Sequence, residues 1–329
     1  MKAIVQNRYG SFDALEYGTA EKPTPGDDEA LVKVHAAAIN FGNLMLISGK
    51  PIFVRTEAGW LRPNKTLNPG SDVAGRVEAV GVNMTQFKPG DEVMADNLAG
   101  GSGTYAEYVC VPENELALKP ANVTFAEAAA APQAALVALQ ALRDVGNIQA
   151  GQKVLIIGAS GGNGSYAVQV AKAFGAVVTA VCSTRNIELV RRLGADHVID
   201  YTQEDFAANG EQYDLILCMG GYRKLKDYVK ALLPKGTFVW AGGNLKGLFE
   251  TFLWGSWATR GTEKRVTNLS HHSNQDDLRF MAELMKDGKV KSEIDRIFSL
   301  EETAEAFRHY AGGHMQGKVV ISVIEDSAG

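Results

Sequence analysis

Cysteine is scarce in this sequence. Its 329 residues include three cysteines, Cys110, Cys182 and Cys218, which lie far apart. The odd number and the wide spacing argue against a disulfide framework and favour a reducing compartment, which we expect to be the cytoplasm. Each cysteine is better interpreted as a small buried apolar residue than as a metal ligand.

Common catalytic patterns are also lacking. The sequence contains no HExxH, CxxC or GxSxG pattern, and its six histidines are scattered except for the pair His271-His272. That pair could bind a metal ion, but a polar loop is the more common setting for adjacent histidines. We therefore expect neither a metal centre nor an activated nucleophile.

Positive net charge and long apolar runs are missing too. The formal net charge is −5, which argues against nucleic acid and anionic membranes as partners, although a local basic patch is compatible with it. The N-terminal residues have no apolar core and do not resemble a secretory signal. The most apolar long stretch, residues 126–142, is interrupted by polar residues and is too polar to span a bilayer. We expect no nucleic-acid partner and no membrane partner.

The composition is that of a globular protein with about two domains, taking ~150 residues for each. Apolar residues make up 46% and charged residues 22%. Up to about residue 125 the chain has strand-length runs at residues 2–5, 30–36 and 71–80, separated by proline and glycine, which predicts a β-rich region. Residues 50–69 are polar and irregular and predict a long loop over a site or a partner surface.

From about residue 127 the pattern changes. An alanine-rich helix is expected up to about residue 144, after which strand and helix patterns alternate, as in a doubly wound parallel sheet. The expected strands are residues 153–157, 177–182, 197–200, 214–218 and 237–241, and the expected helices are residues 165–174, 187–193 and 222–233. Two more helices, at residues 275–287 and 301–310, precede a last strand at residues 318–323.

The β-rich region needs a partner for its last strand, and the tail can supply one only by returning across the alternating region. We therefore predict an inserted domain. Residues 1–126 and 268–329 form one β-rich unit in this prediction, and residues 127–267 form a nucleotide-binding unit.

The strongest functional signal lies in the middle of the chain. The apolar residues 154–157 run into a glycine-rich turn, and a helical pattern follows at once. The spacing Ala159-x-Gly161-x-x-Gly164 matches the dinucleotide-binding fingerprint with alanine in the first glycine position. Absent Cβ atoms let the backbone approach a pyrophosphate, and the helix start supplies N–H groups and a positive dipole. The predicted cofactor-binding residues of this loop are Ala159, Ser160, Gly161, Gly162, Asn163 and Gly164.

The end of the second strand of this region favours NADPH over NADH. An NAD site uses Asp or Glu there to bind the ribose hydroxyls, whereas this chain has Ser183, Thr184 and Arg185. Two hydroxyls and a guanidinium can bind a 2′-phosphate. The alternative, that the hydroxyl residues cap the next helix and Arg185 is solvated, is compatible with this role. Nicotinamide chemistry needs no protein nucleophile, so the missing catalytic patterns agree with it.

Motifs along the whole chain make it similar to a known family. They are residues 38–41, 70–77 with 87–93, 103–108, the loop 159–164, 193–201 and 313–321. With them the chain resembles the zinc-independent medium-chain dehydrogenases/reductases, specifically the quinone oxidoreductase (zeta-crystallin-like) family. The resemblance implies an α/β protein in which a GroES-like β-rich catalytic domain holds an inserted Rossmann domain with a doubly wound parallel sheet.

The resemblance also implies a reaction. In such enzymes a hydride passes from NADPH to a quinone or to the β-carbon of an α,β-unsaturated carbonyl, and polar groups stabilise the charge that develops on oxygen. Asn40 matches the substrate-side asparagine of the family; the alternative is that it only ties its own loop together. Zinc-dependent relatives would have Cys in place of Asn40 and His-Glu in place of Ser71-Asp72, so the resemblance implies a mechanism without metal.

Further cofactor contacts follow from the same resemblance. Tyr201 is expected near the adenosine phosphate, and the turn Gly242-Gly243-Asn244 near the nicotinamide. Gly317 and Lys318 are expected to close the cofactor site from the tail. Packing, an ordinary turn and a solvated lysine are the respective alternatives.

The sequence says less about the substrate and the oligomeric state than about the cofactor. The family pattern is altered by the polar insert at residues 55–65 and at Asn43, Met45, Val137 and Gln316, so substrate preference does not carry over. Two alternatives stay open: an enone or alkenal reductase inactive on quinones, and a non-catalytic NADPH-binding redox sensor or structural protein. By analogy we expect a homodimer, paired through an edge strand near residues 266–269 or 237–241.

Overall fold

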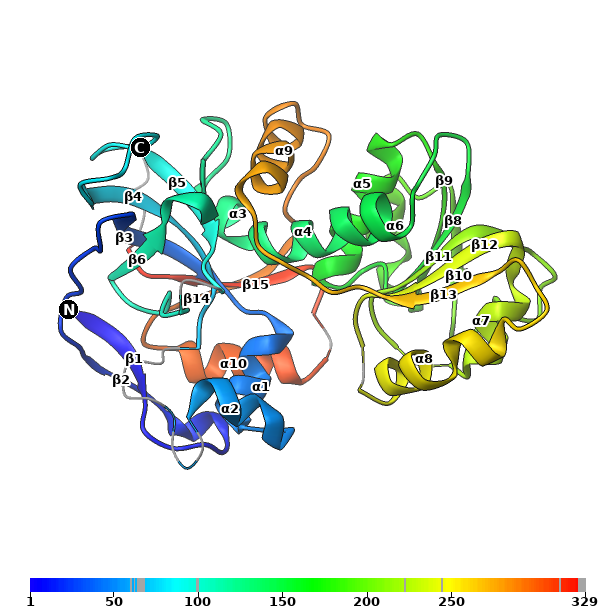
Figure 1. Cartoon of the computed structure of the whole chain (residues 1–329), viewed down its shortest axis with the longest axis horizontal. Helices are drawn as coiled ribbons and strands as arrows, with labels where there is room; N and C mark the ends of the chain where they lie inside the picture. The colour runs from blue at the N-terminus through cyan, green and yellow to red at the C-terminus, as the bar shows by residue number, and fades with distance from the viewer. Residues whose placement is uncertain are drawn as a thin grey trace. The chain divides into compact units, whose positions relative to one another are not determined.

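The fold is that of a computed structural model of the whole chain, residues 1–329. The structure describes all residues except 60, 62, 64–68, 99, 100, 222, 244, 314 and 325–329. The chain forms two compact units (Figure 1). Unit 1 consists of Met1–Gln133, Ser273–Gly288 and Ser292–Gly329, and unit 2 of Ala134–His272 with Lys289–Lys291.

Unit 2 contains a six-stranded parallel sheet. Its strands are β8 (Lys153–Ile157), β9 (Val177–Cys182), β10 (His197–Asp200), β11 (Tyr213–Cys218), β12 (Leu232–Trp240) and β13 (Arg265–Asn268). Their order in space is β10-β9-β8-β11-β12-β13, and every pairing is parallel. The chain reverses direction across the sheet between β8 and β11, which is where doubly wound sheets bind ligands. The predicted doubly wound sheet is confirmed.

Strand β12 differs most from its predicted range. It starts at Leu232, which pairs with Tyr213 of β11, so the helix expected at residues 222–233 is only α7 (Leu225–Lys230). β12 has β11 on one side and β13 on the other. The segment 237–241 is therefore not an edge strand, and that alternative for a pairing surface is wrong. Among the described residues, β13 has a strand neighbour on one side alone.

Helices lie on both faces of this sheet. Figure 1 shows α5 (Gly162–Ala173) and α6 (Ile187–Arg192) on one face, and α7 and α8 (Leu245–Ala258) on the other. Helix α8 was not predicted, because its fully buried residues are the small Gly247, Thr251 and Gly255 while most of its aromatic residues are exposed, the reverse of the usual amphipathic pattern. No helix in the described part of the chain is long and apolar enough to cross a membrane.

The alanine-rich helix predicted at residues 127–144 is divided into three pieces. They are α3 (Phe125–Ala130), α4 (Pro132–Gln140) and a π-helical segment, Ala141–Val145. Pro132 has no N–H to continue the hydrogen-bond ladder, so α3 and α4 are separate helices. Helix α3 packs on strands of unit 1, and for this reason the change from unit 1 to unit 2 lies a few residues beyond the expected boundary at 126/127.

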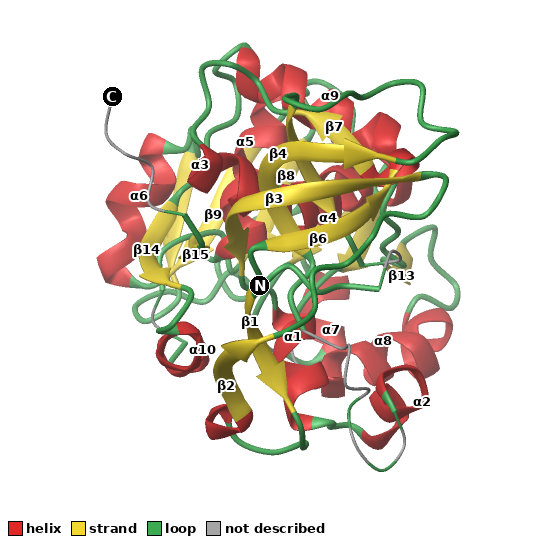
Figure 2. Cartoon of the chain, turned by 90° about the vertical axis from the view of Figure 1, so that its left-hand side faces the viewer, coloured by secondary structure: helices red, strands yellow, loops and turns green. Residues whose placement is uncertain are grey.

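Unit 1 is built mainly on antiparallel strands. Strands β1 (Lys2–Gln6) and β2 (Leu15–Thr19) pair with each other. A larger sheet has the order β14-β15-β3-β4-β5-β7, with β6 paired to β3 (Figure 2). Its strands are β3 (Glu29–Ala38), β4 (Asp72–Val80), β5 (Glu92–Asp96), β6 (Tyr108–Pro112), β7 (Leu116–Leu118), β14 (Ile294–Ser299) and β15 (Lys318–Ser322).

The tail completes this sheet. Strand β15 pairs antiparallel with β3, with Val320 opposite Ala38 and Ile321 opposite Ala37. Strand β3 thereby gains neighbours on both edges, and seven of its ten residues are buried. Because β15 follows the whole of unit 2 in the sequence, the return of the tail that the sequence predicted is confirmed by this pairing.

Four more helices belong to unit 1. They are α1 (Phe41–Ser48), α2 (Arg55–Ala58), α9 (Gln275–Lys286) and α10 (Thr303–Ala311). The expectation of an irregular loop over residues 50–69 is wrong in part, because a 3₁₀ turn (Ile52–Val54) and α2 lie there. Helices α1 and α10 pack on a core that includes Ile39, Tyr105 and Ile321.

Candidate functional site

The glycine loop occupies the carboxyl end of β8, at the switch point of the unit 2 sheet. Gly158 adopts φ +77°, a left-handed conformation that favours glycine. The backbone N–H groups of Gly158 and Ala159 each donate to Val181 O at 3.2 Å, which ties the loop to β9. Gly161 is the N-cap of α5 and offers no side chain to the N–H groups of the first turn. The start of α5 is therefore suited to receive an anion from outside the chain.

The glycines of this loop have two different functions. A Cβ atom on Gly164 would lie 2.0 Å from Gly158 O, so glycine is required there for close packing of the helix on the loop. A Cβ atom on Gly161 would meet only Gly158 O, at 3.5 Å, which is an ordinary contact. The space beside Gly161 is thus open, as a backbone approach to a pyrophosphate needs. The residues fit a dinucleotide.

The turn after β12 lies beside the turn after β11. A Cβ atom on Gly242 would be 2.8 Å from Met219 O, and Gly243 adopts φ +112° next to Gly221 O. Met219 in turn donates its N–H to Ile157 O at 2.9 Å, so these turns share one edge of the sheet with the glycine loop. Close packing alone thus accounts for both glycines, which is the alternative that the sequence left open. Asn244 lies outside the described residues.

The predicted NADPH-selective residues lie together at the end of β9. Ser183 is the N-cap of a 3₁₀ turn that contains Thr184 and Arg185, and its side chain makes no cap hydrogen bond. Arg185 is exposed. Tyr201 is 60% exposed, and its N–H donates to Cys182 O at 3.1 Å, which places it beside the same strand end. Asn186 donates to Ser160 Oγ at 2.7 Å and so links this turn to the glycine loop.

Sequence reasoning missed an acid at this position. Asp200 ends β10 and is paired in register with Cys182 at the end of β9. The Thr184 hydroxyl donates to Asp200 Oδ2 at 2.5 Å, and this bond is the main reason that the pKa of Asp200 lies below its usual value. The residues that follow β9 in the sequence include no carboxylate. The carboxylate comes from the end of β10, which pairs with β9. Thr184 is thus engaged with an anion of the chain itself.

In unit 1, Asn40 and Lys318 belong to one buried cluster. Lys318 Nζ donates to Asn40 Oδ1 at 2.5 Å and lies 3.3 Å from Asp72 Oδ2. Lys318 is 2% exposed and Asp72 is 0% exposed, so the alternative of a solvated lysine is wrong. The ammonium lies among Asn40 and Asp72, two of the residues whose counterparts ligate metal in zinc-dependent relatives, as the sequence resemblance implied.

The start of α1 and the chain around it hold this cluster in place. Asn40 is the N-cap of α1, and its N–H donates to Asn43 Oδ1 at 2.8 Å, as part of a capping box. Asn43 donates to Pro69 O at 2.5 Å and accepts from the Tyr105 hydroxyl at 3.1 Å. Asn40 Nδ2 donates to Ser71 Oγ at 3.3 Å. The Asn40 amide is therefore oriented on both sides by its neighbours.

Burial controls the charges of this cluster. It raises the pKa of Asp72 to about 6, against the lowering effect of Lys318, while Asp96 raises it further. Burial also lowers the pKa of Lys318, and Asp72 opposes that change. The raised pKa of Tyr105 has the same first cause. The lysine and the aspartate thus depend on each other to remain charged inside the protein.

Gly317 has a structural reason to be glycine. It adopts φ +84°, and a Cβ atom there would lie 2.1 Å from Glu293 O. The next residue, Lys318, donates its N–H to the same Glu293 carbonyl at 2.8 Å. The turn at Gly317 therefore starts β15 and directs Lys318 into the cluster.

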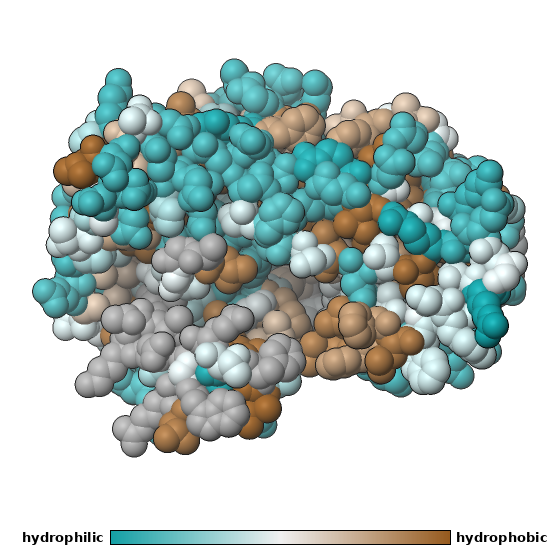
Figure 3. All heavy atoms as spheres, in the orientation of Figure 1, coloured by the Kyte–Doolittle hydropathy of each residue, from teal (hydrophilic) through white to brown (hydrophobic). Residues whose placement is uncertain are grey.

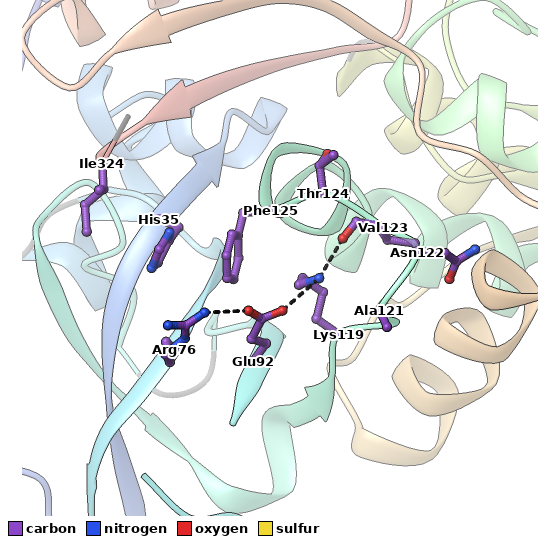
Figure 4. A pocket seen from close by; sticks show the side chains of 10 residues that line it. All are labelled: His35, Arg76, Glu92, Lys119, Ala121, Asn122, Val123, Thr124, Phe125 and Ile324. Carbon is purple, nitrogen blue, oxygen red and sulfur yellow. Dashed lines mark hydrogen bonds and ion pairs between the residues drawn. The ribbon is translucent and has the colours of Figure 1, made fainter. Parts of the chain in front are cut away.

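A separate cavity of about 610 Å³ lies on unit 1 (Figure 4). Glu92 there contacts Arg76 at 2.7 Å and Lys119 at 3.0 Å, and Lys119 also donates to Val123 O at 2.6 Å. The His35 and Phe125 rings stack with centroids 4.0 Å apart. Because its charged groups are paired with one another, we assign no ligand to this cavity.

The cysteines and histidines form no reactive centre in the described part of the chain. Cys182 and Cys218 are buried, Cys110 is half-buried, and all three are free thiols. Burial raises the pKa of Cys110 and of Cys182 to about 11 and that of Cys218 to about 12, so the thiolate nucleophile is suppressed. Within the described residues, no group of three or more His, Cys, Asp or Glu side chains could hold a metal ion.

Comparisons with known proteins match both units. The family described as alcohol dehydrogenase GroES-like domain matches residues 26–121, and the family described as zinc-binding dehydrogenase matches residues 193–321. The structure is similar to that of the quinone oxidoreductase from Coxiella burnetii, with a TM-score of 0.87, 29% identity, and coverage of 98% of this chain and 99% of that one. The predicted combination of a GroES-like and a Rossmann-like domain is confirmed.

Curated relatives cover nearly the whole chain. It is 34% identical to the mitochondrial NAD(P)H oxidoreductase RTN4IP1 of Mus musculus, over 98% of this chain and 89% of the relative. It is 36% identical to the 2-methylene-furan-3-one reductase of Solanum lycopersicum, over 98% of this chain and 79% of the relative.

Substitution of Gly161 and of Gly164 by alanine is expected to have different effects on cofactor binding and on the free energy of unfolding. Gly164→Ala should destabilise the protein by about 1–3 kcal/mol, because the new methyl group collides with backbone. Gly161→Ala should cost less than about 1 kcal/mol, the scale of an N-cap change, yet weaken nicotinamide dinucleotide binding by about tenfold or more through loss of close backbone approach. Denaturant unfolding and fluorescence titration with NADPH measure the two effects. Equal effects of both variants on both quantities would contradict this division of roles.

Removing the buried ammonium is expected to make stability depend on pH. In Lys318→Met the pKa of Asp72 should rise above its present value of about 6, because its main charge-stabilising partner is gone. The variant should lose about 3–5 kcal/mol at pH 8 and clearly less at pH 5. At pH 5 the Asp72 carboxyl of the variant is protonated and needs no cationic partner. As the pH rises through its raised pKa, the carboxyl becomes an unpaired buried charge and stability is lost.

The double variant Asp72→Asn with Lys318→Met is the control for this effect. It leaves no buried charge from the pair, so it should cost less than the sum of the two single variants and lack the pH dependence. Denaturation midpoints of the four proteins at both pH values give the comparison. Additive losses, or equal losses of Lys318→Met at the two pH values, would rule out the coupling.

Proposed function

Because the chain belongs to the quinone oxidoreductase family of the medium-chain dehydrogenases/reductases and is an oxidoreductase with a nicotinamide cofactor, we propose that it uses NADPH to reduce a quinone or an α,β-unsaturated carbonyl without zinc. The observation that carries this proposal is the glycine loop with open space beside Gly161, at the switch point of the parallel sheet. The cofactor, when bound, supplies the hydride. The chain itself then provides binding, orientation and charge stabilisation.

In this proposal the pyrophosphate lies against residues 159–164, at the start of α5. The 2′-phosphate is bound by Ser183 and Arg185, with Thr184 and Tyr201 beside it. Residues 242–244 lie near the nicotinamide, and Gly317 and Lys318 close the site from the tail. The exposure of Arg185 and Tyr201 at one strand end supports the phosphate contact, while Asp200, bonded to Thr184, weakens it through charge repulsion.

Asn40 is the proposed polar contact of the substrate oxygen. The hydrogen bond that Lys318 donates to Asn40 Oδ1 polarises the amide and makes its N–H groups stronger donors. Such donors stabilise negative charge that develops on a carbonyl oxygen. The Lys318 ammonium lies between Asn40 and Asp72, where the sequence resemblance places metal ligands in zinc-dependent relatives, and this supports a reaction that needs no metal ion there.

Two acceptor classes are consistent with the relatives. The Coxiella burnetii structure is named a quinone oxidoreductase, and this favours quinones as the first candidate. The Solanum lycopersicum relative is named for an α,β-unsaturated ketone, which favours a second candidate, an enone or alkenal reductase that is inactive on quinones. In both reactions negative charge develops on a carbonyl oxygen of the acceptor, so the same oxygen contact serves either.

Assembly and location are proposals as well. Strand β13 (Arg265–Asn268), at an edge of the unit 2 sheet, offers unpaired backbone groups through which two copies can pair as a homodimer. The three free thiols support a reducing compartment such as the cytoplasm. Size-exclusion chromatography with light scattering measures the molar mass in solution and so tests the homodimer directly.

NADPH oxidation with a panel of acceptors tests the reaction. We expect turnover with a small quinone, with an enone or with both, and no change on addition of a chelator, because the proposed mechanism uses no metal ion. Asn40→Ala should lower kcat/KM by about 10²-fold, the scale of one lost oxyanion donor. Loss of activity with the chelator would overturn the metal-free mechanism. Tight NADPH binding without turnover of any acceptor would favour a non-catalytic NADPH-binding protein.

Reversal of one charge tests the choice of cofactor. Arg185→Glu should weaken NADPH binding by about tenfold or more, the scale of a charge-assisted hydrogen bond, and leave NADH binding nearly unchanged. Asp200→Asn is the matched variant with the opposite sign and should strengthen NADPH binding, since it removes an anion beside the phosphate. Dissociation constants for both dinucleotides decide the point. Equal weakening of NADPH and NADH by Arg185→Glu would sink the assignment.

A further inference from the structure

Asn186 occupies a position from which its side chain would ordinarily cap a helix. It is the N-cap residue of α6, and asparagine at such a position commonly accepts a hydrogen bond from the first turn. Here the side chain makes no cap hydrogen bond. Its Nδ2 instead donates to Ser160 Oγ at 2.7 Å, across 26 positions of the sequence. Asn186 is 4% exposed, so this bond lies inside unit 2. A local cap is thus left unmade, and the amide is held to a distant loop.

The bond from Asn186 determines what the Ser160 hydroxyl can do. A serine hydroxyl has one hydrogen to donate and lone pairs that accept. Asn186 Nδ2 occupies one lone pair, and among the residues that the structure describes this is the only hydrogen bond of the Ser160 hydroxyl. Ser160 directly precedes Gly161, the N-cap of α5, beside which the space is open. An anion that enters there meets a hydroxyl whose hydrogen is available for donation.

Asn186 also closes the turn that carries Arg185. Its backbone N–H donates to Ser183 O at 2.9 Å. On the other side of the turn, the Thr184 hydroxyl donates to Asp200 of β10 at 2.5 Å. Arg185 therefore lies between two anchored residues, one bonded to the glycine loop and the other to β10, while Arg185 itself is exposed. The backbone that carries the guanidinium is held in place from both sides.

We propose that Asn186 is a positioning residue that couples the two phosphate contacts of the cofactor. This inference rests on the proposed function, in which the pyrophosphate lies against residues 159–164 and the 2′-phosphate is bound by Ser183 and Arg185. Asn186 orients the Ser160 hydroxyl as a donor to the pyrophosphate and holds the turn 183–185 in a fixed place beside it. Asn186 itself touches neither phosphate. NADPH engages both contacts, whereas NADH engages the glycine loop alone.

The coupling has a physical basis in the shared hydrogen bond. A hydroxyl that donates to a phosphate becomes a better acceptor, so the bond from Asn186 to Ser160 strengthens when the pyrophosphate is bound. The stronger bond restricts the turn 183–185 further. The ordering that Arg185 would otherwise undergo on binding the 2′-phosphate is then partly in place beforehand, and this lowers the entropic cost of that contact.

A simpler role for the same bond is to hold the loop and the turn together without reference to a ligand. Loss of Asn186 would then lower the stability of unit 2 and weaken NADPH and NADH binding by the same factor. The two roles differ in the ratio of the two affinities. They also differ in whether Ser160 and Arg185 contribute independently to NADPH binding.

Dissociation constants of NADPH and NADH for the full-length protein, measured by fluorescence titration, test the proposal. Ser160→Ala should weaken both dinucleotides by about tenfold, the scale of a hydrogen bond to a charged group. Asn186→Ala should weaken NADH by a similar factor. It should weaken NADPH by a further factor of about three or more, the scale of ordering one long side chain, because Arg185 is no longer held in place.

A double-mutant cycle measures the coupling itself. Ser160→Ala with Arg185→Ala should weaken NADPH by less than the product of the two single factors, since each single variant already loses the shared contribution. In an Asn186→Ala background the same two substitutions should act independently. Asn274→Ala is the matched control, because this asparagine does cap its helix, α9, through its side chain. It should leave both dissociation constants unchanged.

Three results would overturn the inference. Equal weakening of NADPH and NADH by Asn186→Ala, or independent effects of Ser160→Ala and Arg185→Ala in the otherwise unaltered chain, would reduce the bond to a structural tie. Unchanged affinities in Asn186→Ala would remove Asn186 from the site and leave the proposed function standing. Absence of dinucleotide binding by the wild type would overturn the proposed function as well. Ser160→Ala breaks the same bond from the loop side, so the cycle remains informative if Asn186→Ala does not fold.

Discussion

The buried ammonium of Lys318 is the contact on which unit 1 depends. It is bonded to Asn40 and Asp72, which come from the beginning of α1 and of β4, while Lys318 itself starts β15 near the end of the chain. An unpaired charge at this depth would be strongly destabilising, so β15 has one acceptable register beside β3. The contact thus joins the two ends of the chain within unit 1, on either side of the inserted unit 2.

The contact of Lys318 with Asn40 and Asp72 also orients a side chain that we propose to bind the substrate. Lys318 near the end of the chain and Asn40 before α1 are far apart in sequence, but the Lys318 ammonium orients the Asn40 amide and is paired with the Asp72 carboxylate. In unit 2, close backbone packing and absent side chains leave open space beside the glycine loop, at the start of α5. A bound cofactor would carry the reactive group there, and the chain would contribute binding and orientation.

Close packing of glycine recurs in unit 2 and has two consequences. At Gly164 it brings α5 onto the loop, and at Gly247 it brings α8 onto Trp240. In the second case there is no room for a side chain at Gly247, while five large apolar residues on other sides of the helix are more than half exposed (Figure 3): Phe249, Phe252, Leu253, Trp254 and Trp257.

Much of the fold and part of the site follow from the sequence alone. Local patterns sufficed for β8, β9, β10 and the glycine loop, because an apolar strand followed by glycine and a helical repeat has few other structures. They failed for α8, where apolar residues face outward, and for residues 50–69, where a short helix has no periodic signal. Asp200 was missed because it is close to Thr184 only through pairing of neighbouring strands.

The sequence by itself determined that a doubly wound parallel sheet is inserted in a β-rich unit and that a glycine-rich loop follows the first strand of that sheet, since these depend on residues adjacent along the chain. The tertiary structure alone decided that Lys318, Asn40 and Asp72 form one charge cluster, and that α8 turns its aromatic side outward. Both depend on contacts between residues distant in sequence. There, burial and the space left by glycine, rather than local pattern, select the arrangement.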